Sequence, residues 1–338
     1  MAYNISKLRS NQADIDALVE SAFQHYRSSG FPFYNLTPAD KYRELQNLLN
    51  FDHSRIIANK TIEQKMHGLA LAWSYFPHSW SVECGKMKTP MSIYTDDNAF
   101  RRALAKRAKW GITKFTDSEV RKAVRSFSGA QGVSNFKPIS AAAVYHRYLG
   151  RHGGMVWDMS AGFGGRLLGA IACDHVSHYI GTDPCSATMN GLRSLARELG
   201  RDDLLIELHK IGSEDFRPTG NSLDLCFTSP PYFDTERYSD ETTQSYRKYP
   251  GRQEWLHGFL GTTLDNCHYG LKRSGRLVIN IANVRSYPAL TADFLQMASS
   301  RGWKRVDTLQ YSLSRMMGTR GNGNNGFKCE PIYVFAKR

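Results

Sequence analysis

Apolar residues recur every three or four positions along five stretches of the first 130 residues, which predicts a mostly helical region. The stretches are residues 11–26, 38–49, 60–73, 97–109 and 117–127. Loops with proline, glycine or asparagine separate them. Aromatic residues are dense at 31–34 and 73–80, and such residues usually fill a core. We therefore predict a mostly helical region over residues 1–130.

From residue 153 onward the pattern changes to short apolar runs that alternate with helical stretches, which indicates an α/β domain with a largely parallel sheet. Seven strands are predicted, at residues 155–157, 178–181, 204–209, 223–228, 276–281, 306–312 and 331–336. The last two flank a Gly/Asn-rich loop at 318–326 with no helix between them, so we expect an antiparallel hairpin. Residues 131–338 are thus predicted to form a Rossmann-like, seven-stranded domain.

The charge of the chain favours a polyanionic partner. Lys and Arg number 44 against 31 Asp and Glu, a formal net charge of +13 over 338 residues. Residues 101–125 carry nine Lys and Arg and two acids, a local net charge of +7. A generically basic surface with no partner is the alternative.

Other classes of protein are disfavoured by the composition. The six cysteines are scattered without metal-ligand spacing, so neither structural zinc nor disulfides are expected. No apolar stretch approaches the roughly 20 residues that a membrane helix needs. We expect a cytoplasmic protein with no membrane partner and no metal.

A glycine-rich loop follows the first predicted strand of the α/β domain. The loop begins at Asp158 and includes Gly162 and Gly164, and a helix follows it. Glycines allow a ligand to approach the backbone, and the helix start offers free N–H groups. The next strand ends at Asp183, where a carboxylate suits the hydroxyls of a ribose, although Asp183 would also serve to cap the helix that begins near Ser186.

The spacing within this loop lacks the G-x-G-x-x-G pattern, which argues against a nicotinamide dinucleotide and favours a single nucleoside-like cofactor. The fourth predicted strand runs into Thr228 and then Ser229-Pro230-Pro231-Tyr232. Two adjacent prolines fix the backbone, so a hydroxyl and an aromatic ring are held rigidly near the cofactor loop. A simple strand terminator is the alternative, but rigid acceptors beside a stacking plane describe a base pocket.

The tetrapeptide Ser229-Pro230-Pro231-Tyr232 resembles the (Asp/Asn/Ser)-Pro-Pro-(Tyr/Phe/Trp) signature of the DNA amino-methyltransferases, and the resemblance covers residues 136–338. It implies S-adenosylmethionine as cofactor, with Asp183 at the ribose and Glu214 or Asp215 at the adenine. The residues implied to contact the cofactor elsewhere are Phe136, Lys137, Pro138, Asp158, Ser160, Ala161, Gly162, Phe163 and Gly164. The loop departs from the family's usual Phe-x-Gly-x-Gly at Ser160-Ala161-Gly162-Phe163-Gly164, which weakens the case for Ser160.

The resemblance also implies a mechanism. The Ser229 hydroxyl and the Pro230 carbonyl accept the two hydrogens of an exocyclic amino group, and Tyr232 stacks on the base. Because the base is hidden in a duplex, double-stranded DNA is the expected partner and the base is flipped out. The basic stretch at 101–125 would contact phosphates, and target recognition would come from the N-terminal region or from residues 233–249.

Several alternatives stay open. A first residue Ser favours cytosine N4 over adenine N6 as the target. Pro184-Cys185 resembles the nucleophile of cytosine-carbon methyltransferases, but it follows the second strand and is read as incidental. Methylation of an RNA base, and a DNA-binding protein whose methyltransferase domain is retired, are the competing functions. The target site, the oligomeric state and the biological role, restriction protection or phage modification among them, are not determined.

Overall fold

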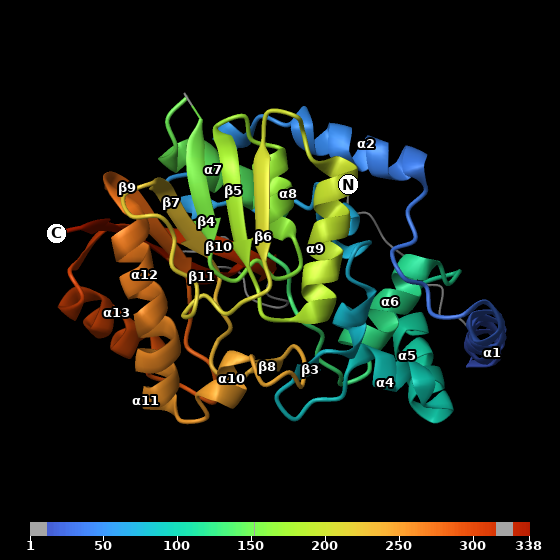
Figure 1. Ribbon diagram of the computed structural model, residues 1–338. Coiled ribbons are helices and arrows are strands. Elements are labelled where there is room, and N and C mark those ends of the chain that lie inside the picture. Colours follow the sequence, from blue (N-terminus) through green and yellow to red (C-terminus); the bar gives the residue numbers. More distant parts are fainter. Residues whose placement is uncertain (1–11, 152, 316–326) are drawn as a thin grey trace, which may run out of the picture. The chain divides into compact units, whose positions relative to one another are not determined.

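The computed structural model describes residues 12–151, 153–315 and 327–338, and these form two compact units (Figure 1). The described residues of 1–35 together with 77–133 form unit 1, and residues 36–76 together with 134–338 form unit 2. The predicted boundary near 130 lies close to the third of the three junctions between the units, at residues 133 and 134. The segment 36–76, which we had grouped with the N-terminal region, belongs to unit 2.

Unit 1 is helical and has its own core. Its elements are α1 (Gln12–Ser29), a 3₁₀ turn η2 (Pro77–Ser81), β3 (Glu83–Cys84), α4 (Pro90–Thr95), α5 (Asp97–Ala108) and α6 (Asp117–Ser126). Asp96 accepts a hydrogen bond from the Ala99 amide and so caps α5, as Thr116 caps α6. The apolar faces of α1, α5 and α6 bury Phe23, Phe100 and Val120 in one cluster.

A nine-stranded sheet forms the centre of unit 2, in the order β1-β2-β10-β11-β9-β7-β4-β5-β6. The strands are β1 (Ile57–Ala58), β2 (Thr61–Ile62), β4 (Gly154–Asp158), β5 (Val176–Thr182), β6 (Leu205–His209), β7 (Leu223–Thr228), β9 (Leu271–Asn280), β10 (Trp303–Arg315) and β11 (Phe327–Lys337). Strands β6, β5, β4, β7 and β9 are parallel. Strand β11 is antiparallel to both β9 and β10, so the seven predicted strands and the terminal hairpin are confirmed. The predicted loop at 318–326 lies outside the described residues.

Helices cover both faces of this sheet (Figure 1). They are α2 (Pro38–Leu49), α3 (Leu69–Trp73), α7 (Pro138–Tyr148), α8 (Gly165–Ile171), α9 (Ser186–Leu199), α10 (Ser245–Lys248), α11 (Arg252–Glu254), α12 (Thr262–Gly270) and α13 (Leu290–Ser300). Unit 2 also contains the 3₁₀ helix η1 (His53–Arg55), the π-helix η3 (Trp255–Gly261) and the short strand β8 (Glu236–Arg237). Successive residues of a strand point to opposite faces. Thus Phe227 packs on Tyr145 of α7, whereas Cys226 joins a cluster with Leu264 of α12 and Phe294 of α13.

The prediction of a helix over residues 60–73 was wrong for its first half. Residues 61–62 form β2, which pairs in parallel with Gln310 and Tyr311 of β10 and buries Ile62. Helix α3 begins only after Gly68, whose φ of +76° lies in the left-handed region. A pairing between residues about 250 positions apart outweighed the local apolar spacing.

The close contact between α7 and α8 depends on Gly169. A Cβ atom placed there would lie 2.6 Å from the Ala141 Cβ and 2.7 Å from the Pro138 carbonyl oxygen. Alanine normally stabilises a helix relative to glycine, by up to about 1 kcal/mol. An alanine at position 169 is expected to lower the free energy of unfolding instead, because overpacking costs about 1–3 kcal/mol.

Gly169→Ala is therefore expected to lower the thermal unfolding midpoint, measured by circular dichroism. Gly150→Ala is the matched control, since a Cβ atom at Gly150 meets nothing within 4 Å. The control is expected to stay within about 0.5 kcal/mol of the unsubstituted protein. Equal midpoints for the two variants would contradict the packing argument.

Candidate active site

Polar residues gather where the parallel strands of unit 2 end. Asp158 is the last residue of β4, Thr228 ends β7 and Asn280 ends β9, while Asp183 follows β5 directly. Pairing of Asp158 with Gly181, and of Thr228 with Ile279, sets these strand ends side by side. In open α/β sheets this carboxyl edge is where ligands bind.

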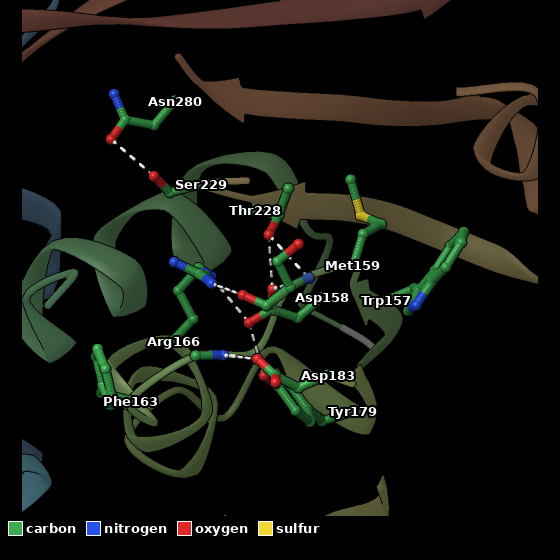
Figure 2. A network of polar contacts seen from close by, with 12 residues as sticks. Trp157, Asp158, Met159, Phe163, Arg166, Tyr179, Asp183, Thr228, Ser229 and Asn280 are labelled. Carbon is green, nitrogen blue, oxygen red and sulfur yellow. Dashed lines mark hydrogen bonds and ion pairs between the residues drawn. The ribbon is translucent and has the colours of Figure 1, made fainter. Parts of the chain in front are cut away.

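Asp158 is the centre of a buried polar network, drawn in Figure 2. Its Oδ2 atom accepts hydrogen bonds from Arg166 Nε at 2.8 Å and from the Tyr179 hydroxyl at 2.7 Å. Its Oδ1 atom accepts one from the Thr228 hydroxyl at 2.9 Å. The Ser160 amide in turn donates to Thr228 Oγ1 at 3.1 Å, so the start of the glycine loop is tied to the end of β7.

This network assigns Asp158 an organising position. The Asp158 side chain has no exposed surface, and both of its oxygens are bound by groups of the chain itself. Burial, together with the neighbouring Asp158 charge, raises the pKa of Tyr179 well above its ordinary value, so the phenol stays a donor. Asp158 was predicted to contact a cofactor, but its side chain instead holds the glycine loop in place.

The glycine loop lies against the segment that precedes α7. Gly162 and Gly164 have φ values of +55° and +70°, a conformation that favours glycine. Gly165 approaches the Phe136 carbonyl so closely that a Cβ atom there would lie 1.8 Å from its oxygen. The Asn135 side-chain amide also donates to the Phe163 carbonyl at 2.8 Å. Two segments that were predicted to share a cofactor are thus in contact.

Asp183 lies at the loop with its carboxylate directed to backbone amides. Its two oxygens accept hydrogen bonds from Gly162 N at 3.0 Å and from Cys185 N at 2.9 Å. Burial raises the pKa of Asp183 to about 6, although these two hydrogen bonds act in the opposite direction. Cys185 itself is buried at the start of α9.

Glu214 and Asp215, the two candidates for an adenine contact, share one cation. Lys248 Nζ lies 2.6 Å from Glu214 Oε1 and 2.6 Å from Asp215 Oδ2. Burial by itself would lower the pKa of Lys248, but the two carboxylates hold it raised. Asp215 is exposed, whereas Glu214 is buried and its Oε2 atom has no partner among the described residues.

The side chains of Ser229 and Tyr232 meet residues from two further strands. Ser229 Oγ lies 3.4 Å from Asn280 Oδ1, and Asn280 Nδ2 donates to the Pro331 carbonyl at 3.1 Å, which fixes the amide orientation. The Tyr232 hydroxyl lies 3.2 Å from both the Asn280 carbonyl oxygen and Glu330 Oε2. Ser229 and Tyr232 remain half-buried, so neither is sealed in the core.

Lys137 and Glu330 add a buried cation and a carboxyl to this side of the site. Lys137 Nζ donates to the Ser312 carbonyl at 3.0 Å and lies 4.6 Å from the centre of the Tyr311 ring. Burial lowers the pKa of Lys137 to about 8 and raises that of Glu330. Pro138 follows as the first residue of α7, where its lost N–H costs nothing.

Phe163 and Ala161, two further residues predicted to contact a cofactor, have buried side chains. Phe163 is buried and packs on Trp73 and Phe76, at ring distances of 5.3 and 5.8 Å, and Figure 2 shows it directed away from Asp158. Ala161 is buried as well, and its amide donates to the Thr182 carbonyl. For these two residues only the backbone is placed to contact a ligand.

Sequence reasoning missed five residues that hold the site together. Arg166, Tyr179 and Asn280 bind the side chains of predicted residues, Asn135 binds the loop backbone and Glu330 binds Tyr232. Only Asn280 carried a signal, since it stands at the end of a predicted strand. The others come from helix or strand interiors and from a linker, where no pattern marks them.

Comparisons with known proteins identify fold-level likenesses only. No protein-family model and no curated protein matches the chain. Among solved structures, the YcgJ protein from Bacillus subtilis is 14% identical and covers 59% of this chain and 97% of its own, with a TM-score of 0.39. An S-adenosylmethionine-dependent O-methyltransferase from Thermotoga maritima is 10% identical and covers 61% of this chain and 67% of its own, with a TM-score of 0.41.

Magnesium protoporphyrin IX methyltransferase from Synechocystis, solved with bound S-adenosylmethionine, is 13% identical and covers 62% of this chain and 87% of its own, with a TM-score of 0.38. At these values the likenesses carry no argument about substrate, and the strand order within the chain establishes its α/β fold. Across the described residues, no helix has the length and apolarity for a membrane span. Within the same residues no group of three or more His, Cys, Asp or Glu is arranged to hold a metal ion.

The ion pair between Arg166 and Asp158 yields a prediction about stability. Arg166→Met is expected to destabilise the protein by about 3–5 kcal/mol, because it leaves a buried carboxylate without its counter-charge. Adding Asp158→Asn removes that charge, so the double variant is expected to be more stable than Arg166→Met alone. Denaturant unfolding of the unsubstituted protein, Arg166→Met, Asp158→Asn and the double variant measures the coupling energy between the two side chains. A double variant no more stable than the single one would show that the charge pairing is not what matters.

Proposed function

We propose that this protein transfers a methyl group from S-adenosylmethionine to the exocyclic amino group of a base flipped out of double-stranded DNA. The observation that carries the proposal is the position of Ser229-Pro230-Pro231-Tyr232 at the same carboxyl edge as Asp183 and the glycine loop. An acceptor set for an amino group and a nucleoside site are therefore adjacent.

The residues at this edge fit an adenosyl cofactor. A Cβ atom at Gly162 would meet nothing closer than the Ser160 carbonyl oxygen at 3.7 Å, so the loop backbone is open to a ligand there. Asp183 offers a carboxylate for ribose hydroxyls, and the buried Glu214 Oε2 offers an acceptor that the chain does not satisfy. When bound, S-adenosylmethionine supplies an electrophilic methyl group on a sulfonium.

Ser229 is oriented to accept a hydrogen bond. Because Asn280 Nδ2 is engaged with the Pro331 carbonyl, Asn280 Oδ1 faces Ser229 as an acceptor and draws the hydroxyl proton. The Ser229 oxygen then presents its lone pairs outward. Accepting an N–H of the base amine localises the nitrogen lone pair that the ring otherwise delocalises, and the Pro230 carbonyl takes the second hydrogen in the same way.

Tyr232 supplies the plane on which the base stacks. Its hydroxyl is held by the Asn280 carbonyl and by Glu330, so the ring is fixed before a base arrives. Burial and the neighbouring Glu330 raise the pKa of Tyr232 well above its ordinary value, so the phenol stays neutral. A fixed ring lowers the entropic cost of aligning the amine with the methyl group.

Cytosine N4 is the favoured target over adenine N6, on the resemblance of the Ser-Pro-Pro-Tyr sequence. An RNA base is the alternative substrate, since a single-stranded base presents the same amine without the cost of flipping. Retirement of the domain is the non-enzymatic alternative. The complete set of Ser229, Tyr232 and Asp183 at one edge favours an active enzyme.

The first prediction concerns the product. Unmodified duplex DNA incubated with the protein and labelled S-adenosylmethionine is expected to yield N4-methylcytosine on nucleoside digestion and mass spectrometry. Tyr232→Ala and Ser229→Ala are expected to lose at least 100-fold in rate, on the order seen when a positioning or acceptor group is removed.

Tyr232→Phe is the matched comparison, because it keeps the stacking ring and loses only the hydroxyl that fixes it, and we expect a smaller loss of rate than in Tyr232→Ala. N6-methyladenine as the product would change the target base and leave the site intact. Methylation of RNA alone would overturn the DNA substrate, and failure to bind the cofactor would favour the retired domain.

The second prediction concerns pH. The anionic form of Asp183 accepts the ribose hydroxyls, and this form is lost as pH falls through its pKa of about 6. The affinity for S-adenosylmethionine, measured by calorimetry, is therefore expected to be about tenfold weaker at pH 5 than at pH 7.5. Asp183→Asn is expected to bind weakly at both pH values. An equal pH dependence in this variant would exclude Asp183 as the titrating group.

The same shift predicts the opposite trend for folding without cofactor. Since burial raises the pKa of Asp183, the protonated side chain stabilises the fold below its ordinary value of 3.8, and this contribution is lost as pH rises through about 6. When the cofactor is bound, hydrogen bonds from its ribose hydroxyls would offset the desolvation cost of the buried Asp183 carboxylate.

A further inference from the structure

The nine cations of residues 101–125 fall into two classes in unit 1. Five are bound within the chain. Arg101 contacts Glu20 at 3.0 Å, Arg107 and Lys122 both pair with Glu119, and Arg121 and Arg125 donate to the Pro32 and Val133 carbonyls. Most of the cations in this stretch are therefore already bound within the chain. The local net charge of +7 overstates the number of cations that are available to a partner.

The other four cations are Arg102, Lys106, Lys109 and Lys114. All four are exposed, and none makes an ion pair or a hydrogen bond with a described residue. Arg102 helps to lower the pKa of Asp96, after the stronger hydrogen bond from Ala99, but forms no ion pair with it. Asp117 and Glu119, the acids of the same stretch, are occupied by Tyr26 and by Arg107 with Lys122.

Three of these cations lie on one side of α5. Positions 102, 106 and 109 are separated by four and three residues, which places their side chains on the same face of a helix. Lys109 is the C-cap residue directly after α5, and Lys114 follows in the connection to α6. Arg102, Lys106, Lys109 and Lys114 are called the basic strip below.

Trp110 lies within the basic strip and is exposed over 58% of its surface. The other five tryptophans of the chain are buried. Its ring contacts Phe127 edge-on, with 5.5 Å between ring centres, so one side of the indole packs on the unit itself. A large rigid aromatic ring bordered by unpaired cations is a common arrangement in nucleic-acid interfaces.

The cations near the end of α5 also compensate the helix dipole. This accounts for Lys106 and Lys109 but not for Arg102, one turn earlier, nor for an exposed indole beside them. Four exposed like charges that form no ion pair with a described residue repel each other, and a polyanion relieves that repulsion. The combination therefore points to a ligand that carries repeated negative charge.

We propose that the basic strip contacts the phosphate backbone of double-stranded DNA, with Trp110 packed against the sugars beside those phosphates. The choice of DNA rests on the proposed function, whereas the position of the surface rests on unit 1 alone. The strip carries no information about sequence, because phosphate contacts fix position and not base identity.

The test measures binding of the full chain to a fluorescently labelled 30-base-pair duplex at several salt concentrations, without methyl donor. Each phosphate contact contributes about 0.9 to the slope of log K against log salt concentration. Replacing all four strip residues by alanine is expected to flatten that slope by about 3.6 and to weaken binding at least 100-fold at low salt.

Two double variants with the same change in formal charge separate position from charge. Lys106→Ala with Lys109→Ala is expected to flatten the slope by about 1.8, whereas Arg101→Ala with Lys122→Ala, which removes cations already paired, is expected to change it little. Equal changes of slope in the two double variants, or an unchanged slope in the fourfold variant, would contradict the proposal that the basic strip contacts DNA phosphates.

Trp110→Phe keeps an aromatic ring on Phe127 and removes the exposed indole. DNA is expected to quench the tryptophan fluorescence of the unsubstituted protein and to leave that of Trp110→Phe unchanged. Quenching that persists in the variant would exclude Trp110 from the contact. A duplex RNA that binds more tightly through the same four residues would overturn DNA as the partner.

Binding and methylation fail independently in this design. Strip-dependent DNA binding without any methylated product would overturn the proposed reaction and support the surface. Methylation together with binding that ignores the strip residues would support the reaction and overturn the surface.

Discussion

The buried ion pair between Arg166 and Asp158 is the interaction on which the candidate site depends. Asp158 lies in the interior at the end of β4, where an unpaired carboxylate would be costly, and Arg166, Tyr179 and Thr228 together compensate it. These partners come from α8, β5 and β7, so one charge ties a helix and three strands to a single arrangement. The glycine loop takes its path from this arrangement, because its first amide is bound to Thr228.

The two halves of the site use polar groups differently. On the side of Asp183, the buried carboxylate is bound by the backbone amides of Gly162 and Cys185, and Lys248 pairs with Glu214 and Asp215. On the side of Ser229, Asn280 and Glu330 hold a hydroxyl and a phenol in fixed orientation while leaving them half-buried. In the proposed reaction the first side binds the nucleoside part of the methyl donor, and the second aligns the neutral amine that accepts the methyl group.

Unit 1 shows that net charge and available charge are different quantities. Its acids and carbonyls bind Arg101, Arg107 and Arg121 so thoroughly that these cations stabilise the helices and not a complex. The unpaired remainder is small, clustered and beside an exposed indole. In the proposed complex such a surface contributes affinity without sequence preference, and residues that reach the bases would have to recognise the target sequence.

The sequence by itself determined seven of the nine strands of the sheet, the terminal hairpin and the order of motifs along the chain, because these follow from local periodicity and from turn residues. It also placed Ser229, Asp183 and the glycine loop at strand ends, and parallel strands necessarily bring such ends to one edge. Only the tertiary structure decided that residues 36–76 belong to unit 2 and add β1 and β2 to its sheet, since the pairing of β2 with β10 spans about 250 positions. It alone decided that Asp158 faces inward to Arg166 and that four of nine cations stay unpaired, because the partner of a charge is set by packing and not by spacing.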